Sequence, residues 1–164
     1  MATDQLNHVV ESAMLLSPEE LEIASQHILD MLDKKKWDAL FKDPRSPKLL
    51  EKLAFEQSIQ QLKTQYTFIQ ADELVTFLRR YPFLIVDLHR IYEIKSKHFD
   101  KSPMDLYYIS ETGSLESATL AAYIKINIPR ERAKDILSYF DEEWWNNISE
   151  EAKTVLVVDM VSNV

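Results

Sequence analysis

The fold is decided by two stretches near the end of the chain: residues 119–128, which read TLAAYIKINI, and residues 154–161, which read TVLVVDMV. In the first stretch, apolar side chains alternate with smaller or polar ones, and this period of two predicts a strand with one buried face. The second stretch is rich in β-branched residues and is apolar on both faces apart from Asp159, so it predicts a strand covered on both sides. The chain is therefore expected to end in a small sheet.

A helix is predicted between these two strands. Pro129 opens it, and Ala133, Phe140 and Trp144 recur on one stripe at helical spacing. A strand, a helix and a strand in succession predict a parallel pair joined by a right-handed crossover.

The residues before this region supply a further strand and two helices. Residues 104–109 predict a strand that forms a hairpin with residues 119–128 through a long loop. Residues 71–81 and 83–99 show helical spacing of apolar side chains, and Pro82 separates them. We expect these two helices to cover the second apolar face of the last strand. Another subunit is the alternative cover.

The first part of the chain reads as helices. Residues 4–16 carry one apolar stripe, and a helix start follows in which Ser17 is the N-cap, Pro18 the first helical residue and Glu20 the partner of a capping box. The pair Ser46-Pro47 repeats this start signal after a break in the chain. We therefore predict an α+β protein with a helical N-terminal module, residues 1–66, followed by an α+β module, residues 70–164, in which a small ββαβ sheet packs with helices.

Composition excludes several classes of chemistry. The chain has 164 residues and no cysteine, so disulfides, thiolate metal sites and a cysteine nucleophile are impossible. Its single glycine, Gly113, is too few for a phosphate-binding loop, a dinucleotide fingerprint or a nucleophile elbow. The net charge of −8 disfavours direct nucleic-acid binding. With no secretory signal and no apolar run of membrane-spanning length, we expect a cytoplasmic protein without a membrane partner.

Two aromatic segments are candidate partner-binding surfaces. Trp37 and Phe41 either pack the N-terminal helices or face a partner. Trp144 fits the core stripe of the helix after Pro129, whereas Trp145 lies off that stripe. Trp145 is therefore packed at a core edge or exposed as a binding anchor.

The titratable residues predict no catalytic residue, no cofactor and no metal. Glu142 and Glu143 belong to an acidic cluster that is either a solvated surface or a docking surface for a basic partner, and as paired carboxylates they would support a hydrolase. His89 and Glu93 share a helix face, but a metal site needs three or four converging ligands. We interpret that pair as a surface ion pair.

Part of the chain resembles a known class of proteins. The matching residues are 16–20 (LSPEE), 36–41 (KWDALF), 43–46 (DPRS) and 50–54 (LEKLA). With these, residues 5–58 resemble short bacterial helical proteins of antitoxin type that are common in cyanobacteria. The resemblance implies a helical scaffold that leads into a toxin-embracing tail. Residues 71–164 resemble an uncharacterised bacterial protein segment, through residues 77–84 (FLRRYPFL) and 141–145 (DEEWW).

These features lead to three hypotheses of function. The first is a non-catalytic protein-interaction or regulatory protein, antitoxin-like, whose partner is another protein such as a small basic toxin-like one. The second is a homodimeric structural protein in which the two-faced last strand or Trp145 is buried between subunits. The third, the weakest, is a hydrolase that uses the acidic cluster around Glu142 and Glu143.

Overall fold

The computed structural model describes residues 17, 20 and 46–163. The chain divides into two compact units, residues 1–60 and 61–164, and each is described by itself. Helix α4, Ser46–Gln65, begins at the second predicted start signal and crosses from the first unit into the second. The helices predicted over residues 4–16 and after Ser17, with the candidates Trp37 and Phe41, lie outside the described residues except for Ser17 and Glu20.

The predicted capping box in the first unit is confirmed. The backbone N–H of Glu20 donates to Ser17 Oγ at 3.2 Å, and the backbone N–H of Ser17 donates to Glu20 Oε2 at 2.8 Å. These reciprocal bonds satisfy two amides that a helix start leaves without partners. The hydrogen bond from the Ser17 backbone, followed by that from its side chain, lowers the pKa of Glu20.

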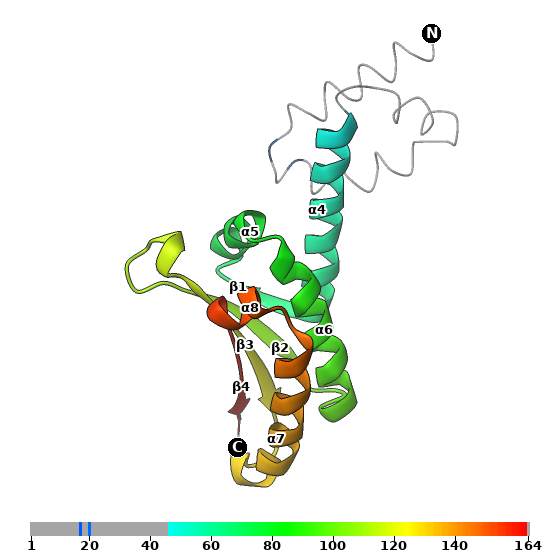
Figure 1. Ribbon diagram of the computed structural model, residues 1–164. Helices are drawn as coiled ribbons and strands as arrows, with labels where there is room; N and C mark the ends of the chain where they lie inside the picture. Colours follow the sequence, from blue (N-terminus) through cyan, green and yellow to red (C-terminus); the bar gives the residue numbers. More distant parts are fainter. Residues whose placement is uncertain (1–16, 18–19, 21–45, 164) are drawn as a thin grey trace, which may run out of the picture. The chain divides into compact units, whose positions relative to one another are not determined.

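The second unit is an α+β fold, as predicted, built on a four-stranded mixed sheet (Figure 1). Its elements, in chain order, are β1 (Tyr66–Ile69), α5 (Ala71–Arg80), α6 (Phe83–His98), β2 (Met104–Ile109), the 3-10 turn η1 (Leu115–Ser117), β3 (Thr119–Ile126), α7 (Arg130–Asn147), α8 (Glu150–Val155) and β4 (Leu156–Ser162). The strand order is β1-β2-β3-β4. The outer pairs β1–β2 and β3–β4 are parallel, and the central hairpin β2–β3 is antiparallel.

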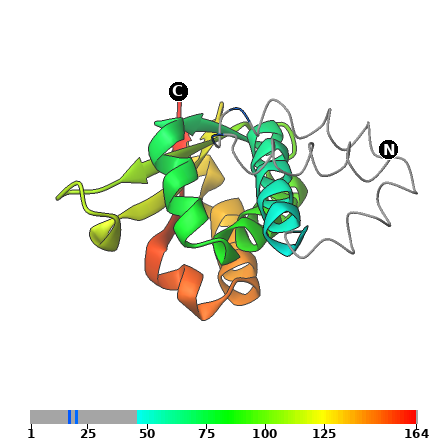
Figure 2. The same cartoon turned by 90° about the horizontal axis from the view of Figure 1, so that it is seen from above.

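All helices of the second unit cover one face of this sheet, so the cover predicted for the last strand is wrong (Figure 2). The rings of Phe77 on α5 and Tyr108 on β2 lie 5.9 Å apart, and the Tyr66 hydroxyl on β1 donates to the Leu88 carbonyl of α6 at 2.7 Å. Helix α7 packs beside α6 on that same face. Val157 on the other face of β4 is 49% exposed.

The reason lies in the topology. Because β2 and β3 are antiparallel while the strand order is sequential, two connections that cover the same face must have opposite hands. Figure 1 views the sheet from its helix side, with β4 to the left of β3, so the β3–β4 connection is right-handed, as predicted. The β1–β2 connection is then of the rare left-handed kind, and this places α5 and α6 beside α7 instead of behind the sheet.

Strand β1 and helix α8 were not predicted. β1 is four residues long and follows a polar helix end, and its parallel partner β2 begins at Met104, far along the chain. For α8, the β-branched residues Thr154 and Val155 were assigned to the strand. The Ser149 side chain instead caps a short helix by accepting from Ala152 N–H at 3.2 Å.

Candidate protein-binding groove

Helix α8 is held in place by a buried carboxylate. Asp87 on α6 is 2% exposed and accepts two hydrogen bonds from Ser149, from the backbone N–H at 3.1 Å and from the hydroxyl at 2.6 Å. The same Ser149 hydroxyl oxygen accepts from Ala152 and begins α8. One side chain therefore fixes the start of α8 against the first half of α6.

The turn from α5 to α6 brings two aromatic rings together. Pro82 ends α5 and opens α6, with Tyr81 before it and Phe83 after it. The rings of Tyr81 and Phe83 meet edge to face, with centroids 6.2 Å apart and planes at 75°. Tyr81 also packs on the buried Phe77 at 4.8 Å. The pair is thus anchored in the core while Phe83 stays 38% exposed.

Between this turn and α8 lies a groove of about 480 Å³, which we call the α8 groove. It is lined by Tyr81, Phe83, Glu150, Glu151, Thr154 and Val155. Its wall is aromatic and aliphatic, and its rim carries the two carboxylates. Val86, one turn after Phe83 on α6, is 54% exposed and continues the apolar surface.

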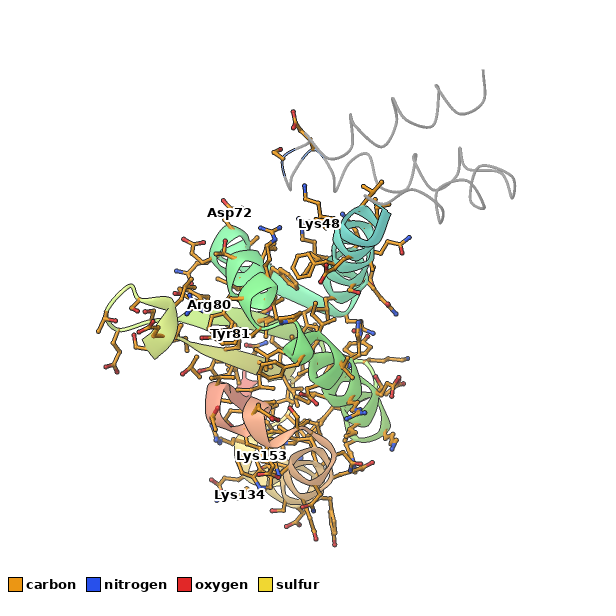
Figure 3. The ribbon with its side chains drawn as sticks, turned by 45° about the horizontal axis from the view of Figure 1, so that its top comes forward. Lys48, Asp72, Arg80, Tyr81, Lys134 and Lys153 are labelled. Carbon is orange, nitrogen blue, oxygen red and sulfur yellow. The ribbon has the colours of Figure 1, made fainter. Side chains whose placement is uncertain are left out.

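The two carboxylates at the rim differ in their ion pairs. Glu150 forms an ion pair with Lys153 at 2.5 Å, one turn further along α8. For the Glu151 carboxylate no ion pair occurs within the described residues. Arg80 lies 5.8 Å from the centroid of the Tyr81 ring and pairs at 3.8 Å with Glu116 in the β2–β3 connection (Figure 3). The groove therefore offers an apolar surface beside a carboxylate that is open to an external cation.

The predicted partner-binding candidates on α7 differ in how exposed they are. Trp144 is 5% exposed and its indole N–H donates to Asp141 at 3.0 Å, so it belongs to the core. Trp145 is 45% exposed, and its ring stands edge to face on Trp144 with centroids 5.4 Å apart. Glu142 is exposed. Of these three candidates, Trp145 and Glu142 are available to a partner.

Glu143 is occupied by contacts within the chain. Its two carboxylate oxygens bind Lys97 Nζ at 2.6 Å and His98 Nε2 at 2.7 Å, both at the end of α6. The hydrogen bond from Lys97, followed by that from His98, lowers the pKa of Glu143. This carboxylate joins α7 to α6.

His89 was predicted to form a surface ion pair with Glu93, but its hydrogen-bond partner is Gln65. His89 Nδ1 donates to Gln65 Oε1 at 2.7 Å, and burial lowers the pKa of His89 against a smaller opposing effect of Glu93. Within the part of the chain that the structure describes, no three His, Asp or Glu side chains gather as a metal site.

A chain of contacts leads from Trp145 to the groove. The Lys153 ammonium lies 5.3 Å from the centroid of the Trp145 ring and pairs with Glu150 on the rim (Figure 3). Sequence reasoning found Trp145 but missed the groove, because Tyr81, Phe83 and Glu151 come from two distant segments. The available signals were an aromatic on each side of Pro82 and a Ser-Glu-Glu helix start at Ser149.

Comparisons with protein-family models, with curated proteins and with solved structures gave no significant match. Among the described residues, no helix combines the length and hydropathy that crossing a membrane requires.

Proposed function

We propose that this chain is a non-catalytic protein-interaction or regulatory protein, and that the α8 groove holds a segment of its partner. The observation that carries the proposal is an aromatic wall and an acidic rim meeting in one concave surface. Such a surface is complementary to a segment that presents an apolar side chain beside a basic one. The net charge of −8 favours approach of the same basic partner.

Magnitudes indicate that the groove acts together with further contacts. Burying one aliphatic side chain contributes about 1.5–3 kcal/mol, and an exposed ion pair adds up to about 1 kcal/mol. Their sum corresponds to binding of roughly millimolar strength. Trp145 is an exposed aromatic side chain on α7 that is joined to the rim through Lys153 and Glu150. We propose that it extends the same interface.

The resemblance of residues 5–58 to antitoxin-like proteins supports a finer proposal for the partner. In such proteins the helical scaffold leads into a tail that embraces a toxin. The partner would then be a small basic toxin-like protein, and its basic, apolar segment would occupy the α8 groove.

Photo-crosslinking in the native host tests the proposal. With p-benzoylphenylalanine at position 83 of the full chain, we expect one basic protein to be captured. Adding Glu150→Lys and Glu151→Lys should lower the yield about tenfold, the equivalent of about 1.4 kcal/mol. As a control, Glu111→Lys reverses one charge in the exposed β2–β3 connection, away from the groove, and should leave the yield unchanged. Capture of no basic protein, or equal capture by all variants, would contradict the proposal.

A further inference from the structure

The uncovered face of the sheet carries an apolar row that crosses all four strands. Ile69, Tyr107, Ala121 and Val157 are successive partners in the register from β1 to β4. Val161 and Ile109, on the same face, are 42% and 43% exposed. The face also holds an edge-to-face pair of Tyr107 and Tyr123, with centroids 5.4 Å apart. No helix of residues 61–163 lies over it (Figure 2).

The charges on this face cancel in pairs. Lys125 Nζ binds Asp105 Oδ2 at 2.7 Å, and Arg130 Nη2 binds Asp159 Oδ1 at 3.0 Å. In a chain of net charge −8, this face is therefore locally neutral. This face offers no net negative charge to attract a basic partner, whereas two copies of the same acidic chain repel each other least when they meet here.

One carboxylate of this face is already removed from water in the folded chain. Asp105 is already only 5% exposed, and its Oδ1 atom is buried without a hydrogen-bond partner among the described residues. The cost of dehydrating that carboxylate has thus been met within the folded chain. A row of apolar side chains is also self-complementary, because a two-fold axis brings each row onto its own copy.

Pairing through the edge of the sheet is obstructed. On the outer side of β4, Asp159 Oδ1 accepts the backbone N–H of Met160 at 2.7 Å, and Arg130 Nη1 donates to the Met160 carbonyl at 3.4 Å. Both backbone groups of Met160 are therefore occupied, and an added strand cannot pair there. With this edge blocked, contact between two copies through β4 is left to the sheet faces, which stack about 10 Å apart in proteins.

We infer that the uncovered face is a homodimer interface, with a second copy of this chain as its occupant. Four strands about 4.8 Å apart and six residues of about 3.3 Å each span roughly 400 Å². That is about half of the roughly 800 Å² per partner of a standard interface. The interface is below standard size, so we expect a weak dimer and test it for a dissociation constant of roughly micromolar order.

Sedimentation equilibrium of the full chain at about 100 μM, well above a micromolar dissociation constant, tests the inference. We expect twice the 19.2 kDa protomer mass. Val157→Lys with Val161→Lys should give a monomer. Val86→Lys, an equally exposed valine in the helix layer, should leave the dimer intact. Circular dichroism confirms that each variant is folded, and Ile109→Lys on β2 provides a second, independent face variant.

A full chain that is monomeric at this concentration would overturn the inference, as would a dimer that survives both face variants. A monomer in which a spin label at position 157 broadens the signals of residues 1–45 would assign the face to that segment and would overturn it equally. None of these outcomes bears on the α8 groove, which lies on the helix side of the sheet.

Discussion

Asp87 shows how one residue can position a binding surface. It is an acid that follows four apolar residues at the start of α6, and its two oxygens both accept hydrogen bonds from Ser149, 62 positions further on. Because the same serine caps α8, the acidic rim of the groove depends on a carboxylate that does not line it. The position of the groove rim therefore depends on the buried contact between Asp87 and Ser149.

Replacing Asp87 with alanine should destabilise the fold and loosen the rim of the groove. Two hydrogen-bond donors of Ser149 lose their acceptor, and an unsatisfied buried polar group costs about 1–3 kcal/mol. Urea unfolding followed by tryptophan fluorescence measures the change. Asp135→Ala, at an exposed position of α7, should have an effect close to zero. Equal midpoints for the two variants would show that Asp87 does not anchor α8.

His89 should make stability depend on pH. Burial lowers its pKa below the ordinary 6.5, so the folded chain favours the neutral imidazole that hydrogen-bonds Gln65. The stabilising contribution is present in full above pH 6.5 and is lost as the pH falls through the lowered pKa. Titration of the His89 imidazole by NMR gives that pKa directly. His89→Gln should flatten the unfolding free energy across this range, and a His89 pKa at or above 6.5 would refute the expectation.

Strand β4 has one face toward the helix layer and one toward the proposed dimer interface. Its residues Leu156, Val158 and Met160 pack under the helices, whereas Val157 and Val161 face away from them. It is also an edge strand, and such strands invite pairing with other chains unless they are blocked. The contacts of Arg130 and Asp159 with Met160 supply the block.

Removing the block should expose the edge. Arg130→Ala frees the Met160 carbonyl and removes the ion pair of Asp159, so we expect slow assembly into species larger than a dimer. Static light scattering over several days at 37 °C follows it. Arg132→Ala, at an exposed position two residues further along α7, removes the same charge and should leave the mass constant. A stable mass for Arg130→Ala would mean that β4 is protected by another feature.

Periodicity predicted the elements whose stabilising contacts lie within the element or its neighbour. The alternation in β3 and the stripe of Ala133, Phe140 and Trp144 in α7 are examples: β3 ends two residues before the predicted Ile128, and α7 begins one residue after Pro129. β1 and the left-handed connection after it depend on a partner strand far along the chain. Nothing in the local pattern encodes either. The α8 groove escaped prediction for the same reason, whereas Trp145 was recognisable as the tryptophan off the core stripe.

Taken together, the two faces of the second unit have opposite chemistry. The helix layer carries the groove with Glu151, which has no ion pair among the described residues, and the uncovered sheet face is apolar and neutral. On the two proposals together, one molecule would bind a basic partner on one side and its own copy on the other. A dimer would present two grooves, and a partner with two basic segments would gain affinity by binding both.

Chemical-shift mapping tests the proposed use of the α8 groove most directly. Uniformly ¹⁵N-labelled full chain is titrated with a short helical peptide of leucine and arginine, and with a matched peptide of leucine and glutamate. We predict that the basic peptide alone shifts the amide signals of Phe83, Glu151 and Thr154, and that Phe83→Ala weakens its binding. Shifts confined to other surfaces, or the same shifts with both peptides, would contradict a groove that recognises an apolar and basic segment.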